Sequence, residues 1–490
     1  MQNLARLAVR LLPFVPAVAA FVFAGAGNGI PALRHDWEVP ATTGAEAGYF
    51  QSMYEGWLPY GIGYPIAYPT TFLLGFIGRV IAMLHVPPWW LLVVWLLAIA
   101  IFIAACSVRA FAALKAPPWA AVAGATLAIC NPWVYNELVA GHLPMIAAYG
   151  ACIGIAGELC TRTPRAGVLA ALAIVAMMQI QFGIVAGTIV FVWLLVHRRW
   201  IAASTIFAVA APTMLGIVAY HGLMGGIPYL LTWQNVQSVS QSQGILLSGY
   251  FAHYASGMLG IVRWPIRVFA AAPFAAILAA FVWKRPALAL CALAFVPLLL
   301  ASGSKGPIGP LYTFAVAAVP QTGVYRELYD LIGFVAVGYV CSLAVVTARI
   351  RALAWLALAA AAPLVAAWFV YPASAHWIDA RTIPQPPVAK NGYRYALMPP
   401  FVPMRMRGRG SGLDPDTIPS FGLPQPVNKY VPYTPMFPVD NALAEYAATG
   451  NATMLGALGV SAVYARPYLE SDTASLRHSI SGMPAVRAGS

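Results

Sequence analysis

The sequence contains very little charge. Asp, Glu, Lys and Arg make up 9% of its 490 residues, whereas 61% of the residues are hydrophobic. Average soluble domains carry roughly 25% charged residues, and long apolar runs with few charges are typical of membrane spans. The composition therefore excludes an ordinary soluble enzyme and predicts an all-α polytopic membrane protein.

Cysteine is also scarce. The six cysteines lie within or at the ends of apolar runs, at Cys106, Cys130, Cys152, Cys160, Cys291 and Cys341. None of them has the C-x-x-C spacing that indicates a zinc or redox site. The sequence thus predicts neither a disulfide framework nor a cysteine metal centre.

Two further features are missing. The net charge is +13, but the basic residues are dispersed in pairs and form no cluster with interleaved aromatic residues, so nucleic acid is not an expected partner. The first apolar run lacks an A-x-A-like cleavage site and is expected to be a retained span.

Apolar runs of roughly 17 to 25 residues indicate transmembrane helices. We expect about eleven, near residues 9–30, 88–107, 118–135, 143–159, 166–180, 183–196, 201–220, 264–283, 286–302, 330–347 and 352–371. Basic pairs such as Arg162 and Arg165 fall in alternate connections, which the positive-inside rule assigns to the cytoplasm. The N-terminus is then inside and the C-terminus outside.

Residues 66–86 are long enough to span but contain Arg79. Counting them as a span would move most of the basic pairs outside, so we expect a helix on the outer surface or a re-entrant segment. The predicted domains are a membrane domain, residues 1–371, which includes an outer loop, 31–87, and an extracytoplasmic region, 372–490, of small mixed α/β character.

Ionisable groups near spans are functional candidates because they are costly there. The stretch RHDWEVP places Asp36 and Glu38 at the exit of the first span, with His35 and Trp37 interleaved. In an extended segment both carboxylates share one face, where either could accept a proton from a hydroxyl or hold a divalent cation, Mg or Mn. The alternative is a solvated loop with Trp37 at the membrane interface.

Other candidates lie in two short outer turns. NPWVYNELVAGH supplies Asn131, Tyr135, Glu137 and His142 as substrate-binding candidates between the third and fourth spans, or simply a polar turn. Gln181, in MMQIQFG, either hydrogen-bonds a sugar or caps a helix end.

Two basic residues could bind a phosphate. Arg326, in TGVYRELYDLIGF, has the planar fork that suits phosphate oxygens, and Lys305 lies on the same outer segment. Alternatively Arg326 pairs with Asp330 at i, i+4 and stabilises the start of a helix.

This layout resembles the GT-C superfamily of membrane glycosyltransferases. The segments GYPIAYPTTFLLG, NPWVYNELVAGH, GVYRELYDLIGF and LGALGVSAVYARPYLES are similar to those of bacterial arabinofuranosyltransferase-related and YfhO-like membrane proteins. The resemblance implies inverting sugar transfer from a polyprenyl-phosphate-linked donor to a glycan, glycolipid or glycoprotein acceptor, on the outer face of a bacterial inner membrane. It carries the family's first-loop aspartate onto Asp36, with Glu38 as the competing choice.

Two departures and two alternatives accompany this expectation. The first loop has D-x-E in place of DxD and the tail lacks a WWDYG-like block, which leaves the metal requirement open. A transporter or flippase of a lipid-linked glycan would share the layout, but midplane charges are expected there and the predicted spans are nearly free of ionisable residues. A non-catalytic scaffold that binds polysaccharide is the third possibility.

Overall fold

The fold is known from a computed structural model of the chain. It describes residues 11–26, 57–58, 64–65, 80, 83–85, 88–140, 142–220, 238–249, 277–278, 285–319, 325, 327–370, 394–398, 402–406, 409–414, 445–446, 449–451, 453–457 and 460–465. The chain divides into two compact units, the first comprising residues 1–29, 93–221 and 226–374, and the second comprising 30–92, 222–225 and 375–490.

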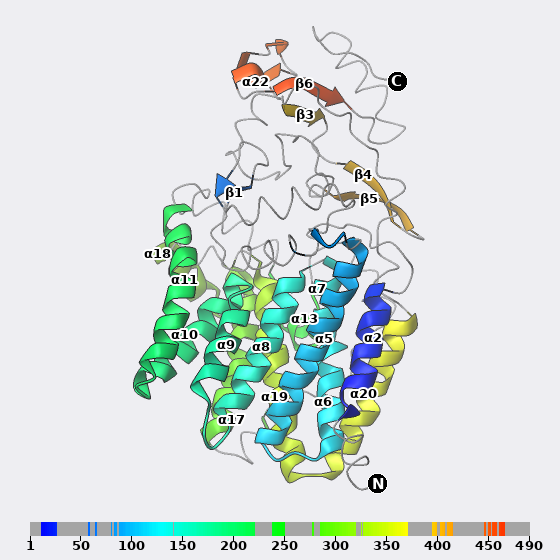
Figure 1. The fold of residues 1–490 in the computed structure, drawn as a ribbon, viewed down its shortest axis with the longest axis vertical. Helices are drawn as coiled ribbons and strands as arrows, with labels where there is room; N and C mark the ends of the chain where they lie inside the picture. Colours follow the sequence, from blue (N-terminus) through cyan, green and yellow to red (C-terminus); the bar gives the residue numbers. More distant parts are fainter. Residues whose placement is uncertain are drawn as a thin grey trace. The chain divides into compact units, whose positions relative to one another are not determined.

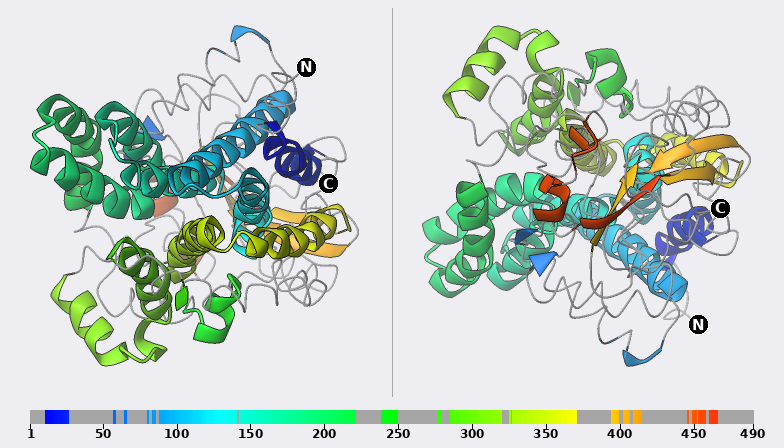
Figure 2. Two further views of the ribbon diagram at one scale, coloured as in Figure 1. Left: turned by 90° about the horizontal axis from the view of Figure 1, so that it is seen from below. Right: turned by 90° about the horizontal axis from the view of Figure 1, so that it is seen from above.

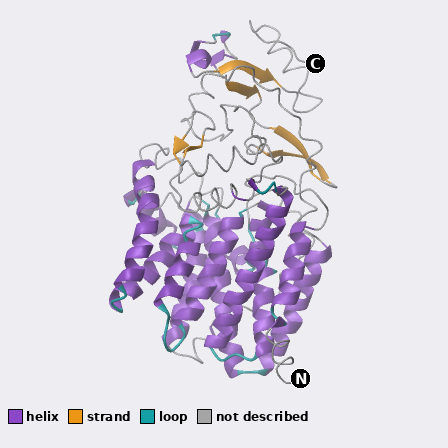
Figure 3. Cartoon of the chain, viewed as in Figure 1, coloured by secondary structure: helices purple, strands orange, loops and turns teal. Residues whose placement is uncertain are grey.

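The described part of the first unit is helical (Figures 1 and 3). Its elements are α2 (Phe14–Ala26), α5 (Pro88–Ala113, in this unit from Val93 onward), α6 (Pro118–Ile129), α7 (Pro132–Ala140), α8 (Leu143–Leu159), α9 (Ala166–Ala176), α10 (Ile180–Val196), α11 (Trp200–Tyr220), α13 (Gln241–Ile245), α17 (Arg285–Ala301), η2 (Gly303–Lys305), α18 (Gly309–Ala318), η4 (Leu328–Leu331), α19 (Ile332–Arg349) and α20 (Ala352–Val370). Figure 2 views these helices from their two ends.

The described strands belong to the second unit. They are β1 (Trp57–Leu58), β2 (Tyr64–Pro65), β3 (Arg394–Met398), β4 (Val402–Met406), β5 (Arg409–Asp414) and β6 (Val460–Ala465), with a short helix α22 (Thr453–Ala457) before β6. β1 pairs with β2 and β4 with β5 in antiparallel fashion, whereas β3 and β6 pair in parallel. The mixed α/β fold expected for residues 372–490 stays a prediction.

The helices follow the apolar runs of the sequence. A helix lies at every predicted position except 264–283, where only residues 277–278 are described. Among the described helices, Val94–Ala113 and Leu328–Arg349 are long and apolar enough to cross a membrane, and several shorter apolar helices accompany them. Of the expected surface helix over 66–86, the described part is residues 80 and 83–85.

The structure corrects the prediction of a polar turn over residues 131–142. Residues 132–140 form the helix α7, and Asn131 through Leu138 are buried. Asn131 and Pro132 end α6 and begin α7, because proline has no N–H to continue a helix but suits a first helical position. The side chains of Trp133, Val134 and Leu138 are buried, as expected for apolar residues on a packed helix.

Glycines allow α8 to approach α5 closely. A Cβ atom added at Gly150 would lie 2.7 Å from Ile103 Cγ1, and one at Gly157 would lie 2.6 Å from Ala110 Cα. Small residues spaced along one helix face permit this contact, as in many membrane helix pairs. The approach brings Arg109 of α5 beside Glu158 of α8.

Replacing Gly157 by alanine should destabilise the first unit by about 1–3 kcal/mol, because the new methyl group must push against the backbone of α5. Gly167→Ala is the matched control, since a Cβ at Gly167 on α9 meets no atom within 4 Å. Alanine there should be neutral or slightly stabilising. The thermal unfolding midpoints of the two purified variants check this, and equal midpoints would contradict the close contact of α5 and α8.

Candidate functional site

Asn131 joins two helices through both atoms of its amide. Its Nδ2 donates to the carbonyl oxygens of Leu127 and Ala128 at 3.1 and 2.9 Å, and more weakly to Tyr149 Oη at 3.4 Å. Its Oδ1 accepts from the Val134 N–H at 3.0 Å, which caps the start of α7. This candidate residue therefore positions α7, and its hydrogen-bonding capacity is used within the fold.

Tyr329 ties α7 to two distant segments. Asn136 Nδ2 donates to Tyr329 Oη at 2.9 Å, and Tyr329 Oη donates to the Leu247 carbonyl at 3.0 Å. The indole N–H of Trp133 donates to the Tyr329 carbonyl at 3.3 Å. All of these residues are buried, so each hydrogen bond offsets the free-energy cost of removing a polar atom from water.

A carboxylate and a histidine are paired at the end of α7. Glu137 Oε2 and His142 Nδ1 are 2.5 Å apart. The backbone N–H of His142 also donates to the backbone carbonyl of Glu137 at 2.9 Å. The Glu137 side chain is fully buried and that of His142 is 12% exposed. When Nδ1–H donates a hydrogen bond to the carboxylate, Nε2 of the neutral ring is an acceptor, and this nitrogen can take up a proton or bind a metal.

Gln181 lies at the start of α10 and is nearly buried. Its carbonyl oxygen accepts from Tyr325 Oη at 2.9 Å, and its side-chain oxygen accepts from Gln179 Nε2 at 2.9 Å. Burial, and to a lesser degree the charge of Asp330, raises the pKa of the Tyr325 hydroxyl well above its ordinary value. Tyr325 therefore remains a neutral donor that joins α10 to the segment before η4.

Aromatic rings of neighbouring helices pack against one another. Trp133 contacts Tyr149 and Phe182 at ring-centroid distances of 5.1 and 5.8 Å, and Phe182 stacks on Phe334 at 4.5 Å. Tyr135, another candidate, is buried with its ring edge-on to Trp368 at 5.6 Å. Such pairs favour one arrangement of the helices over others, because ring geometry is specific.

The structure thus brings several candidates to one end of the first unit, where α6 ends and α8, α10 and α19 begin. We call this group the polar cluster and define it as Asn131, Asn136, Glu137, His142, Gln181, Tyr325, Tyr329 and Asp330. Asp330 is 2% exposed and is held by its N–H, which donates to the Glu327 carbonyl at 3.1 Å. A buried layer of ionisable and hydroxyl groups is where chemistry is expected in an apolar protein.

The remaining candidates are placed differently. Lys305 is exposed on η2, whose Gly303 lies against Leu328 of η4. His35, Asp36, Trp37, Glu38 and Arg326 lie outside the described residues. In the described part of the chain, no three His, Cys, Asp or Glu side chains are grouped as a metal ion would need.

Sequence reasoning missed the tyrosines of this site. In GVYRELYDLIGF the charged residues are the candidates, whereas tyrosines such as Tyr325 and Tyr329 are common at membrane interfaces and do not by themselves indicate a site. Their signal is the spacing: four positions apart, they frame Arg326 and Glu327 and adjoin Asp330. Contact with Asn136 could not be read from the chain, since 193 positions separate it from Tyr329.

Replacing Glu137 by glutamine should lower the stability of the first unit by about 1.5–3 kcal/mol, because it replaces a charge-assisted hydrogen bond to His142 by a neutral one in a buried setting. Glu327→Gln makes the same change at a half-buried side chain and should cost clearly less. Unfolding midpoints in detergent measure both effects. Equal losses in the two variants would contradict a stabilising contribution from the Glu137–His142 hydrogen bond.

The chain matches no protein-family model, no curated protein and no solved structure.

Proposed function

We propose that the protein is a membrane glycosyltransferase of the GT-C type. It transfers a sugar from a polyprenyl-phosphate-linked donor to a glycan, glycolipid or glycoprotein acceptor of the cell envelope. The observation that carries the proposal is the polar cluster, a buried layer with a carboxylate–histidine pair at one end of an otherwise apolar helical unit. Such a layer suits a polar headgroup or sugar delivered from the bilayer.

The surface of the helices supports a membrane location. Large apolar side chains are exposed on several helices, for example Val196 at 70%, Ile201 at 87% and Leu356 at 65%. Water would disfavour so much exposed apolar surface, whereas lipid would not. We therefore propose a multi-pass protein of the bacterial inner membrane with about eleven spans, the N-terminus inside and the C-terminus outside.

The distribution of charge supports the orientation. The helix ends and connections at the end opposite the polar cluster carry basic side chains, which are Arg109, Lys115, Arg162, Arg165, Arg198, Arg199, Arg349 and Arg351. By the positive-inside rule these connections face the cytoplasm. The polar cluster then faces the periplasm or the exterior, the side on which the proposed acceptor is built.

The proposed reaction is a single displacement. Asp36 accepts the proton of the acceptor hydroxyl, with Glu38 as the competing base, and the hydroxyl oxygen bonds to the anomeric carbon. The bond from that carbon to the donor phosphate oxygen breaks, and its electron pair stays on the phosphate. Arg326, with Lys305, offsets this charge, and the configuration of the anomeric carbon inverts.

The remaining proposed roles concern binding of the sugar. His35, Trp37, Tyr135, Glu137, His142 and Gln181 are the proposed sugar-binding residues, with Asn131 holding α7 in place. Of these, Glu137 and His142 form a paired carboxylate and imidazole, and buried hydrogen-bonding groups of this kind discriminate hydroxyl patterns strongly. A divalent cation, Mg or Mn, would be held by Asp36 and Glu38 and would stabilise the leaving phosphate.

The test is transfer of radiolabelled sugar from polyprenyl-phosphate donors to envelope glycan. Membranes that contain the protein should transfer label that membranes without it do not. A companion assay in sealed vesicles follows movement of the labelled lipid between leaflets. Movement of the lipid without any transfer would replace the proposal by a flippase, and the absence of both activities would favour a scaffold.

A further inference from the structure

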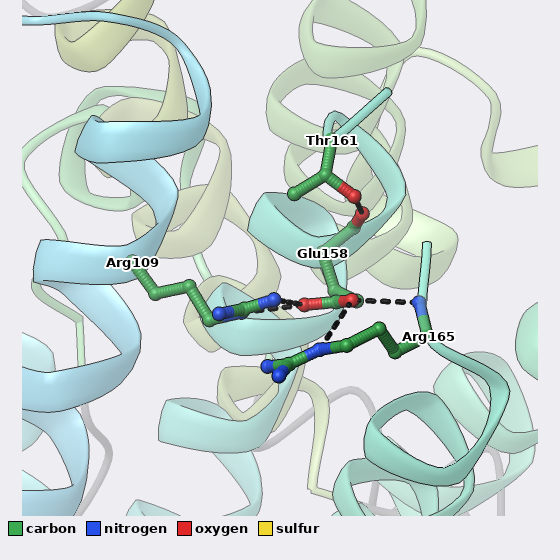
Figure 4. Close-up of polar contacts among 4 residues, drawn as sticks. All are labelled: Arg109, Glu158, Thr161 and Arg165. Atoms are coloured by element: carbon green, nitrogen blue, oxygen red, sulfur yellow. Dashed lines mark hydrogen bonds and ion pairs between the residues drawn. The ribbon is translucent and has the colours of Figure 1, made fainter. Parts of the chain in front are cut away.

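A second charged centre lies at the other end of the first unit. The carboxylate of Glu158, at the end of α8, is fully buried and contacts two arginines (Figure 4). Arg109 donates to Oε2 through Nε at 2.5 Å and also through Nη2. Arg165 approaches Oε1 with its Nε at 3.5 Å, and its backbone N–H donates to the same oxygen at 2.7 Å. We call Arg109, Glu158 and Arg165 the arginine clamp.

The clamp holds more positive than negative charge. One carboxylate neutralises one guanidinium, so the three side chains together carry one positive charge. Only the Nε of Arg165 points at Glu158, and within the described part of the chain its two terminal nitrogens have no hydrogen-bond partner. The side chains of Arg109 and Arg165 are 36% and 61% exposed, so their outer edges are open to a ligand.

The turn that carries Arg165 is fixed by hydrogen bonds. Thr161 Oγ1 donates to the Glu158 carbonyl at 2.7 Å, and the Thr161 N–H donates to the same carbonyl at 3.0 Å. These bonds close the turn between α8 and α9 that carries Arg165. Together with the contact of its Nε with Glu158, the fixed turn reduces the side-chain entropy that Arg165 loses when it binds an anion.

The surroundings of the clamp resemble a membrane interface. Trp119 and Trp355 stack at 5.3 Å near the starts of α6 and α20, and Trp200, at the start of α11, is 60% exposed. Further basic residues at this end are Lys115, Arg162, Arg198 and Arg199, all of them exposed. A belt of tryptophans beside exposed cations is typical of the level of lipid headgroups.

We propose that the arginine clamp binds the phosphate of an anionic phospholipid of the surrounding membrane. The free fork of Arg165 matches phosphate oxygens in geometry, and the surplus charge favours a lipid with net negative charge. A lipid is the favoured source of the phosphate because apolar side chains continue away from this end, including Val192 and Val196 on α10. The proposal depends on a membrane location and not on glycosyl transfer.

The experiment is native mass spectrometry of the full-length protein in detergent. It counts retained dioleoylphosphatidylglycerol and dioleoylphosphatidylcholine in the wild type, Arg165→Gln and Arg199→Gln. Arg199 is the matched control, an exposed arginine at the same end and outside the clamp. We expect selective retention of phosphatidylglycerol, lost about tenfold in Arg165→Gln and little changed in Arg199→Gln.

Arg165→Lys keeps the charge without the fork and should retain an intermediate amount of phosphatidylglycerol. Three results would overturn the proposal: equal retention of the two lipids by the wild type, equal losses in Arg165→Gln and Arg199→Gln, or displacement of the lipid by an equal concentration of inorganic phosphate. The last would assign the clamp to a soluble phosphate. Because lipid retention is measured without any donor, a failed transfer assay leaves this test intact.

Discussion

Membranes that contain the Asp36→Asn variant should transfer labelled sugar about 100- to 10,000-fold more slowly than membranes with equal amounts of wild-type protein. That is the usual contribution of a general base. Asparagine has almost the same shape as aspartate but cannot accept the proton of the acceptor hydroxyl. Donor binding should persist, so the loss should appear in kcat rather than in KM for the donor.

Two further variants make this result specific. Glu38→Gln should reduce transfer much less if Asp36 is the base, and Asp414→Asn makes the same change at the end of β5 and should leave transfer unchanged. A large loss in Glu38→Gln with little in Asp36→Asn would move the base to Glu38. Equal transfer by all variants would contradict the proposed displacement at RHDWEVP.

Removing the carboxylate of the arginine clamp should have the largest effect on stability. We expect Glu158→Ala to destabilise the first unit by about 2–4 kcal/mol, because the donors of Arg109 and Arg165 lose the buried acceptor that they share. Arg109 and Arg165 would then face each other across the space that Glu158 occupied, and the turn before α9 would lose the bond to the Arg165 N–H. The thermal unfolding midpoint in detergent measures the loss.

The control for Glu158→Ala is Arg351→Ala. Arg351 is exposed between α19 and α20, and surface charges of this kind contribute roughly 0–1 kcal/mol. A Glu158→Ala midpoint close to that of Arg351→Ala would show that the clamp does not hold α5 to α8. Glu158→Gln should fall between the two, since the amide oxygen still accepts a hydrogen bond from an arginine.

The positions of the helices were predictable because they depend on local properties. Runs such as 143–159 and 352–371 are apolar over helix-forming lengths, and α8 and α20 follow them closely. The exception is the segment after Ile129, where one predicted span is divided into α6 and α7. The break at Asn131 and Pro132 was visible in the sequence, but the burial of the helix that follows was not.

Composition and periodicity were enough to predict an apolar, mostly helical protein with most of its basic residues near helix ends and between helices, because both properties act within one segment of the chain. Which polar groups meet depends on the packing of the helices. Glu137 lies five positions before His142, but Arg109 meets Glu158 across 49 positions and Asn136 meets Tyr329 across 193. Close contacts between helices, such as that of Gly157 with Ala110, select the partners of buried side chains, because a densely packed interior allows few alternative arrangements.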